Sequence, residues 1–347
     1  MSRLLILLLL TASFVVTPVV AGEIFKCRDA MGRVAFQDHP CHRADKEERL
    51  ILAPSHASDT TTGTEPALAT AIQPEKGQAD SKSFAWKLSK GKRQGYLMGS
   101  IHFGKASMYP LPLTLLNAFK GSDALVVEAN VLDADASTMA HTMMSAGVYS
   151  DGTTLKEVLG AELWGELGVT STALGISVSM LEGMKPWFAS MTLTAMALNG
   201  IGLDESLGID RHFLEMAKAQ HKPIRELESV QQQLALLSGL PQKIQIAMLK
   251  QTLKDVAVAD AYFDRMLKAW QSGDVLALNR LFVDEGLKSD ELNRLLNTDR
   301  NITMAKKVDE MLIKGCHCFV VVGAGHLGGE AGMIKLLQAK GYEVEQL

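Results

Sequence analysis

The stretch that decides the fold is Tyr96–Gly104, which reads YLMGSIHFG. It is a short apolar run that ends at His102, with a glycine three residues before the histidine. A second run of this kind, Phe319–His326 (FVVVGAGH), lies near the end of the chain. Each run has the length of a buried strand, with its histidine at or just beyond the C-terminal end. Ligands bind outside the carboxyl ends of strands in open α/β sheets, so both histidines are predicted to face one site.

Three other charged residues have positions that fit such a site. Glu128 follows the apolar strand ALVV, and Glu228 ends a short strand that begins near Lys222. Arg300 lies in a helical segment, where a fixed guanidinium suits a carboxylate, phosphate or developing oxyanion. Each feature also has a plainer interpretation. The histidines fit unrelated turns, Glu128 fits a helix cap or rim salt bridge, and Arg300 fits an ordinary first-turn charge.

Composition sets the class of protein. The chain has 347 residues, of which 47% are hydrophobic and 21% charged, with a net charge of −4. This length suits one large domain or two ordinary ones, and this balance suits a packed core. A nucleic-acid partner would require a clustered basic face, which the mixed charges do not form, so none is expected.

Residues 1–21 have the pattern of a secretory signal peptide. Arg3 precedes the apolar run Leu4–Leu10, and small residues lead to Ala21, where we place the cleavage. A retained anchor is the alternative, but the apolar run is short for a membrane span and Pro18 follows it. We therefore expect a periplasmic or secreted protein with no transmembrane segment in the mature chain.

Residues 22–45 are predicted to form a small β module. Two short strands would end near Cys27 and Gln37, and Cys27 and Cys41 enclose a polar loop. An oxidising compartment favours a disulfide between them, which would contribute roughly 3 kcal/mol by limiting the unfolded chain. The segment resembles a small cysteine-bridged module common in exported Gram-negative proteins, which implies an envelope location. Residues 46–82 are rich in Ser, Thr and Pro and are predicted to be a flexible linker.

Residues 83–347 form the predicted main domain. Its strands and helices indicate an α/β (α+β) fold, a central mostly parallel sheet with a large helical insertion. Residues 84–88 are predicted to be an edge strand, and a helix that begins near residue 153 is predicted to end at Gly160. The segment 186–201 reads as a buried helix, and the methionines of the helical region suit its core.

Two motifs near the C-terminus resemble a metal site and a dinucleotide site, but we predict neither. Cys316 and Cys318 flank a histidine, but they lie at the opposite strand end from His326, some ~20 Å away. We expect them to be small buried residues rather than metal ligands. Gly323, Gly325 and Gly328 fit the dinucleotide fingerprint, but no second half of a doubly wound sheet follows, so no dinucleotide cofactor is predicted.

The main domain resembles the TraB/GumN family, which includes bacterial pheromone-shutdown proteins and the animal Tiki proteases. The resemblance is carried by Tyr96–Gly104, Ala124–Glu128, Gly208-Ile209-Asp210, Lys222–Glu228 with a downstream glutamine, Arg300-Asn301 and Gly323–Gly329. The family pattern of paired Gly-x-x-His motifs, a glutamate and an arginine corresponds here to His102, His326, Glu128 and Arg300. The Tiki members imply a metal-dependent peptidase.

The resemblance gives a specific hypothesis. His102, Glu128 and His326 would bind a divalent transition metal (Mn, Co, Zn or Fe) that activates water, and a peptide or small molecule would be the substrate. Glu228 is a candidate general base or extra ligand, and Arg300 a candidate anion stabiliser. The chain has no His-Glu-x-x-His or Gly-x-Ser-x-Gly motif. The alternative is a non-catalytic protein of the cell envelope that binds or sequesters a peptide or small ligand.

Overall fold

The computed structural model describes the chain except for residues 1–23, 29–33, 38–45, 51–81, 134–135 and 284–289. The chain divides into two compact units, one within residues 15–78 and the other containing residues 79–347. The predicted signal peptide and most of the predicted linker lie outside the described residues. Cys41 does as well, so its disulfide with Cys27 stays a prediction.

The N-terminal unit contains a three-stranded antiparallel sheet. Its strands are β1 (Ile24–Arg28), β2 (Val34–Gln37) and β3 (Lys46–Leu50), in the order β2-β1-β3. The first two match the predicted strands. The prediction that the linker begins at residue 46 is wrong, because β3 occupies 46–50. Its sequence KEERL has no alternating apolar pattern, and backbone pairing with β1 decides its conformation.

The main unit is built on a six-stranded sheet in the order β7-β6-β8-β5-β4-β9. In chain order the strands are β4 (Ala85–Lys90), β5 (Arg93–Ser100), β6 (Ala124–Val127), β7 (Ile224–Glu226), β8 (Cys318–Gly323) and β9 (Glu343–Gln346). Neighbours from β7 to β5 run parallel, whereas β4 and β9 pair antiparallel. The predicted α/β fold with a mostly parallel sheet is confirmed. The prediction that β4 is an edge strand is wrong, because β9 returns to pair along it.

Helices cover both faces of this sheet. On one face, α2 (Leu113–Lys120) and α6 (Ile209–Ala219) place Phe119 and Phe213 against Phe319 of β8, with ring centroids 5.7 and 4.9 Å away. On the other face lies α12 (Asp299–Ile313), which approaches β5 closely at Gly95. A Cβ atom at Gly95 would stand 2.8 Å from a methyl group of Leu312, so the strand needs glycine there.

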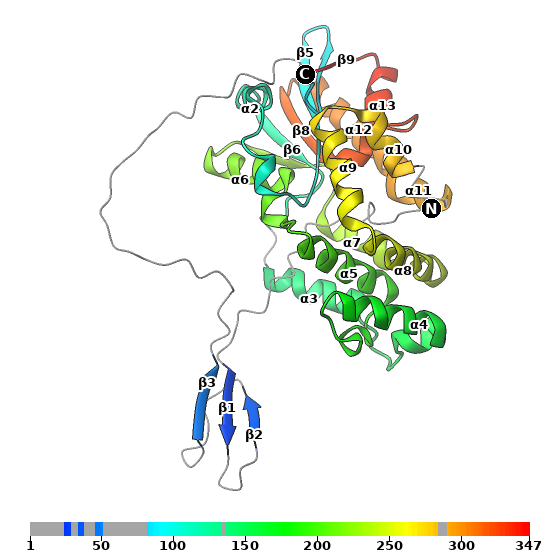
Figure 1. The fold of residues 1–347 in the computed structure, drawn as a ribbon. Coiled ribbons are helices and arrows are strands. Elements are labelled where there is room, and N and C mark those ends of the chain that lie inside the picture. The colour runs from blue at the N-terminus through cyan, green and yellow to red at the C-terminus, as the bar shows by residue number, and fades with distance from the viewer. Residues whose placement is uncertain (1–23, 29–33, 38–45, 51–81, 134–135, 284–289) are drawn as a thin grey trace, which may run out of the picture. The chain divides into compact units, whose positions relative to one another are not determined.

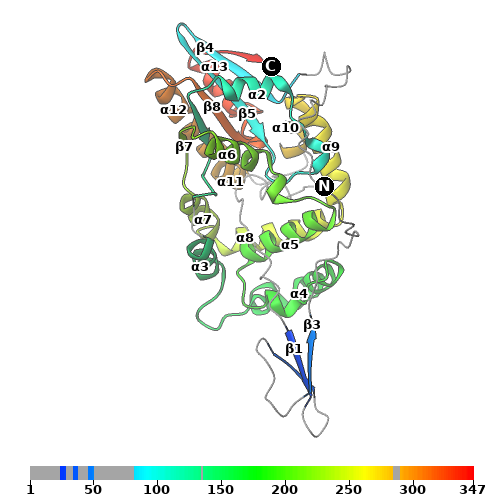
Figure 2. The same cartoon turned by 90° about the vertical axis from the view of Figure 1, so that its left-hand side faces the viewer.

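The predicted helical insertion is also confirmed. Between β6 and α6 the insertion contributes α3 (Ala136–Gly147), α4 (Leu155–Ala173) and α5 (Pro186–Gly200). Between β7 and α12 it contributes α7 (Val230–Ser238), α8 (Gln242–Val256), α9 (Ala259–Gln271), α10 (Val275–Val283) and α11 (Asp290–Asn293). Figures 1 and 2 show α3, α4, α5 and α8 stacked together beyond the carboxyl end of the parallel strands. They enclose apolar clusters of their own, so this helical layer forms one wall beside the strand ends.

Two helices of the insertion test the sequence predictions directly. The buried helix predicted at 186–201 is confirmed as α5, in which Trp187 and Leu193 are fully buried. The prediction that a helix ends at Gly160 is confirmed. Gly160 is non-helical, with φ 74° and ψ 170°, and a second helical segment follows it within α4 and packs Leu163 and Leu167 into the core.

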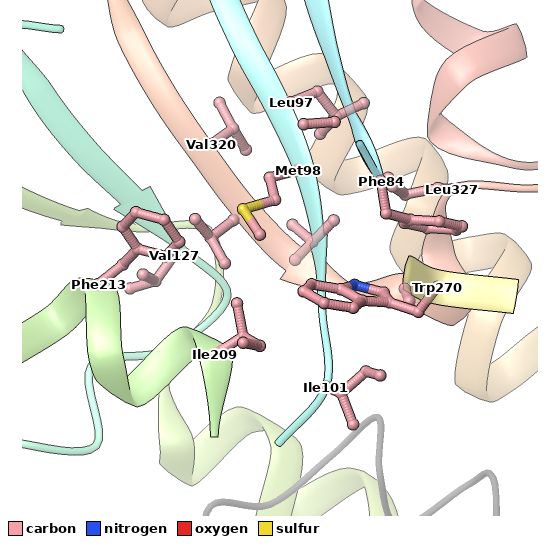
Figure 3. Close-up of a cluster of buried hydrophobic side chains, with 14 of the residues drawn as sticks. Phe84, Leu97, Met98, Ile101, Val127, Ile209, Phe213, Trp270, Val320 and Leu327 are labelled. Atoms are coloured by element: carbon pink, nitrogen blue, oxygen red, sulfur yellow. The ribbon is translucent and has the colours of Figure 1, made fainter. Parts of the chain in front are cut away.

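The apolar core of the main unit surrounds β5, as Figure 3 shows. Phe84, Trp270 and Leu327 gather beside the end of this strand. The indole Nε1 of Trp270 donates to the carbonyl oxygen of Gly99 at 2.7 Å. A Cβ atom at Gly99 would stand 2.6 Å from the ring of Phe84, so the glycine that precedes His102 by three residues is required by packing.

Cys316 and Cys318 form a disulfide at the start of β8. This corrects the expectation that both are simple buried residues. Cys318 is buried and Cys316 is half-buried, and the turn that enters the strand brings their Cα atoms to 5.3 Å, within the range that a disulfide bridges.

Candidate active site

His102 is placed by the end of β5 and by the start of α6. The imidazole is buried, and its Nδ1 lies 2.9 Å from Oδ2 of Asp210, which belongs to the first turn of α6. The backbone N–H of Ile209 donates to the carbonyl oxygen of Ile101 at 2.9 Å. Gly208 fits between these segments because any Cβ atom there would collide with the His102 carbonyl. The glycine therefore lets α6 present its aspartate to the ring.

His326 is placed by the end of β8 and by α12. It ends a short 3-10 turn (η5, Ala324–His326) and is completely buried. Its Nδ1 lies 2.6 Å from Oδ1 of Asn301. The Asn301 amide nitrogen donates to the carbonyl oxygen of Ala331 at 2.9 Å, so the amide oxygen faces the ring as an acceptor. Nδ1 of His326 therefore carries the proton, and the lone pair of the neutral ring lies on Nε2.

Glu128 lies between the second histidine and Arg300. Its Oε1 accepts a hydrogen bond from the backbone N–H of Gly323 at 2.6 Å and lies 3.5 Å from Nε2 of His326. Its Oε2 accepts from Nη2 of Arg300 at 3.0 Å and from the amide of Gln233 at 3.3 Å. These donors hold the carboxylate at the end of β6, where the sequence predicted it.

Arg300 pairs with two glutamates. Its Nε and Nη2 donate to the two carboxylate oxygens of Glu228, at 3.0 and 2.7 Å, and Nη2 also reaches Glu128. Nη1 donates to the carbonyl oxygen of Leu296 at 3.1 Å. Leu296 belongs to a π-helical stretch, η4 (Arg294–Thr298), and π-helical turns are frequent at functional sites. The anions that Arg300 holds in this structure are thus the protein's own carboxylates.

The two histidines have opposite pKa shifts. Burial lowers the pKa of His102, but the carboxylates of Asp210, Glu128 and Glu205 outweigh burial and raise it above its ordinary value. The pKa of His326 is far below its ordinary value because burial, Arg300 and His102 all oppose a positive charge there. The two histidines follow Ser100 and Gly323, which are paired in register across β5 and β8.

The carboxyl groups of the site also have shifted pKa values. Burial raises the pKa of Glu128, and the opposing charges of Arg300 and His102 reduce that rise. Burial, reinforced by Asp210, raises the pKa of Glu205 to about 7. Glu205 lies in a 3-10 turn (η3, Glu205–Leu207) just before α6. The carboxyl groups of Glu128, Asp210 and Glu205 therefore all lie close enough to affect the charge of His102.

A small cavity opens among these residues. Its volume is about 20 Å³, enough for one water molecule. Its lining consists of Ser100, His102, Val127, Glu128, Ala129, Val131, Asp210, Gln233, Val321, Val322 and Gly323. The cavity thus lies at the carboxyl ends of β5, β6 and β8, and α6 and α7 contribute Asp210 and Gln233 to its lining.

The structure places all five predicted site residues at this end of the sheet. His102, Glu128 and His326 adjoin the strand ends, and Glu228 and Arg300 reach Glu128 through their ion pair. Across residues 82–133, 136–283 and 290–347, no three His, Cys, Asp or Glu side chains already form a metal-binding group. The predicted metal site therefore stays a prediction.

Sequence reasoning gave no role to the residues that orient the two histidines. Asp210 and Asn301 belong to the Gly208-Ile209-Asp210 and Arg300-Asn301 motifs, and in sequence each position also fits an ordinary helical residue. Gln233 donates its amide to both Glu128 and Glu228, although in sequence it is one of three consecutive glutamines near a helix start. A signal was present for Asp210, because it follows a glycine and an apolar residue at a helix N-terminus, but only tertiary packing pairs it with a ring.

Fold and site together define an α/β protein with a buried histidine, carboxylate and arginine cluster at the carboxyl ends of its parallel strands. Residues 84–346 match the model of the TraB/PrgY/gumN family. The chain belongs to this family, and the resemblance seen in its sequence is confirmed. Residues 6–66 match a domain of unknown function, DUF4124, which agrees with the predicted N-terminal module.

Similar curated proteins extend this result without adding an activity. The uncharacterized protein YbaP from Escherichia coli (strain K12) and that from Shigella flexneri are each 33% identical over 253 residues. Each alignment covers 72% of this chain and 89% of the relative. No solved structure matches the chain. Within the described part of the chain, no helix has both the length and the apolar character that crossing a membrane requires.

Proposed function

We propose that the chain is an exported, metal-dependent hydrolase of peptides, in which His102, Glu128 and His326 bind a divalent metal ion. The observation that carries this proposal is the matched orientation of the two histidines. Nδ1 of His326 is hydrogen-bonded to the amide oxygen of Asn301, and Nδ1 of His102 lies 2.9 Å from Oδ2 of Asp210, at ion-pair distance. The buried Nε2 atom of each ring has no hydrogen-bond partner among the described residues.

This arrangement is the one that metal-binding histidines adopt. A ligating histidine donates its other ring N–H to a carboxylate or carbonyl oxygen, which fixes the tautomer and directs the free nitrogen to the ion. A buried nitrogen without a partner is otherwise unfavourable, because it has lost its hydrogen bonds to water. Imidazole nitrogens and a carboxylate suit a transition metal, and Nε2 of His326 lies 3.5 Å from Glu128.

The charges of the site favour the same ligand. Glu128 and Glu228 share the single guanidinium of Arg300, and Asp210 and Glu205 add further carboxyl groups. The raised pKa of the buried His102 reports the negative potential that they create. A divalent cation would compensate this potential.

Each residue has a definite part in the proposed site. A bound metal ion lowers the pKa of water and polarises a carbonyl, and Mn, Co, Zn and Fe all suit imidazole and carboxylate ligands. Arg300 holds Glu128 and Glu228 at fixed positions, and the Gly323 N–H orients one oxygen of Glu128. Glu228 is the candidate base, and Arg300 and the amide of Gln233 hold its carboxylate in place.

The proposed location is the periplasm or the outside of the cell. Its support is the signal-peptide pattern of residues 1–21 and the match to DUF4124, whose members include exported proteins. The Cys316–Cys318 disulfide suits an oxidising compartment.

The test is metal binding and peptide cleavage by the purified chain and by His102→Ala and His326→Ala. We expect the wild type to retain a stoichiometric transition metal and to cleave peptides, and each variant to lose more than the 10–100-fold in metal affinity typical of outer-shell changes. His141→Ala is the matched control, because His141 is exposed on α3 away from the site. A wild-type protein without affinity for any of these metals would disprove the proposal.

A second outcome favours the non-catalytic alternative. If peptide binding survives chelator and the loss of both histidines, the site sequesters a ligand without turnover. Isothermal titration with and without chelator separates the two functions.

A further inference from the structure

Ser100 lines the site, but its hydroxyl takes no part in the ion pairs or histidine contacts described above. It is the last residue of β5 and is paired in register with Gly323 of β8. The side chain is only 2% exposed, and its hydroxyl has no hydrogen-bond partner in the described segments of the chain. A buried hydroxyl without a partner is unfavourable, so such a group in a well-packed sheet indicates an occupant that the protein itself does not supply.

The place for that occupant is the cavity of about 20 Å³, which Ser100 lines together with His102. A buried water requires roughly 10–15 Å³ of such volume and two to four polar partners. Glu128, Asp210 and Gln233 also line the cavity, so polar groups surround Ser100 on several sides. Volume and chemistry therefore suit one water molecule.

Ser100 ends β5 and His102 follows two residues later, outside the strand. Both residues line the cavity. Gly323, opposite Ser100 on β8, has no side chain that would fill the space. The second Gly-x-x-His element has Ala324 where the first has Ser100, so only the first element contributes a hydroxyl.

We propose that Ser100 binds and positions a single buried water molecule in this cavity, and that this water is the one consumed in hydrolysis. The second half of this inference rests on the proposed function. In that step the water oxygen bonds to the scissile carbonyl carbon and the carbonyl–nitrogen bond breaks. The proton released by the water passes to the departing amine, so the products are a carboxylic acid and an amine. Ser100 keeps its own proton throughout and is a positioning residue.

The first test is crystallographic, on the metal-free full chain. We expect one ordered water within hydrogen-bond distance of Ser100 Oγ in the wild type. It should persist in Ser100→Thr, which keeps the hydroxyl, and be lost or displaced in Ser100→Ala. A cavity without ordered water in well-resolved wild-type crystals would overturn the inference, and this result does not depend on any catalytic activity.

The second test is kinetic. Ser100→Ala should lower kcat roughly 10–100-fold, the effect of misplacing a reacting group, with KM and metal content unchanged. Ser100→Thr should recover most of kcat. Thr252→Val is the matched control, because the Thr252 hydroxyl is also fully buried and unpartnered in the described chain but does not line the cavity. That variant should keep the wild-type kcat.

The outcomes separate the two proposals. An unchanged kcat in Ser100→Ala, with the wild type active, refutes the role of Ser100 and leaves the hydrolase intact. A wild type that cleaves no peptide although crystals show water on Ser100 removes the proposed function and supports the water site alone.

Discussion

His102 and His326 follow equivalent glycines at the ends of two adjacent parallel strands, yet they have different partners. Nδ1 of His102 lies beside the carboxylate of Asp210, and Nδ1 of His326 lies beside the amide oxygen of Asn301. The pKa of the first ring is raised, and that of the second is lowered far below its ordinary value. One motif therefore produces two chemically different imidazoles, because the residue that orients each ring comes from a different helix.

The ion pair between Glu128 and Arg300 increases the difference. The negative charge of Glu128 contributes to the raised pKa of His102, and the positive charge of Arg300 contributes to the lowered pKa of His326. The two strands thus place the histidines in similar backbone positions, and the surrounding charges give the two rings different pKa values. The following predictions test this comparison, beginning with the largest expected effect.

Arg300→Ala should have the largest effect on stability. It leaves Glu128 and Glu228 buried without their shared cation, and breaking a buried ion pair from one side costs about 3–5 kcal/mol. Urea denaturation of the metal-free protein measures this change. Arg294→Ala is the control, because its ion pair with Asp299 is exposed and should contribute at most about 1 kcal/mol. Equal losses in the two variants would show that Arg300 does not stabilise the buried carboxylates.

Exchanging the two orienting residues should change the histidines in opposite directions. Asp210→Asn removes a carboxylate from His102 and should lower the pKa of that ring, whereas Asn301→Asp should raise the pKa of His326. Asp210→Asn should also reduce metal affinity roughly 10–100-fold, because the ring loses its outer-shell carboxylate. NMR titration of the imidazole resonances measures both pKa values. If neither pKa moves, the partners of Nδ1 do not set the difference.

The pH dependence of stability should show the same contrast with a smaller effect. His326 has a depressed pKa, so the unfolded chain takes up a proton that the native state does not, and stability is lost as pH falls below about 6.5. His102 has a raised pKa, so its contribution is lost as pH rises through that raised value. Urea midpoints of the chelator-treated protein, measured on both sides of pH 6.5, test this contrast. In His326→Gln the midpoint should depend less on pH below about 6.5. In His102→Gln it should depend less on pH at higher values, where the wild-type ring loses its proton.

Glu205→Gln should give the smallest change. The Glu205 pKa rises from 4.5 to about 7 on folding, so its contribution is present below pH 4.5 and is lost as pH rises through 7. The variant should therefore be more stable than the wild type above pH 7, by roughly 1–2 kcal/mol after allowance for partial exposure, and should show no such gain near pH 4.5. A gain that is equal at both pH values would show that packing, rather than ionisation, is responsible.

Much of this architecture was predictable because it depends on local patterns. The strand ends at His102, Glu128 and His326 were found from apolar runs, and buried parallel strands produce such runs. The errors occurred where contacts between distant segments decide. β4 is not an edge strand because β9 pairs with it. The disulfide of Cys316 and Cys318 depends on a turn that their spacing alone does not specify.

The sequence by itself determined the fold class, the family and the five charged or imidazole residues of the site, since each follows from short-range periodicity or from a motif. Only the tertiary structure decided how these residues are paired. It placed Asp210 and Asn301 behind the two rings and Arg300 between two glutamates, and it left the Ser100 hydroxyl facing a space the size of one water. The physical reason is that ionisation and hydrogen bonding depend on distances of a few ångströms between segments far apart in the chain.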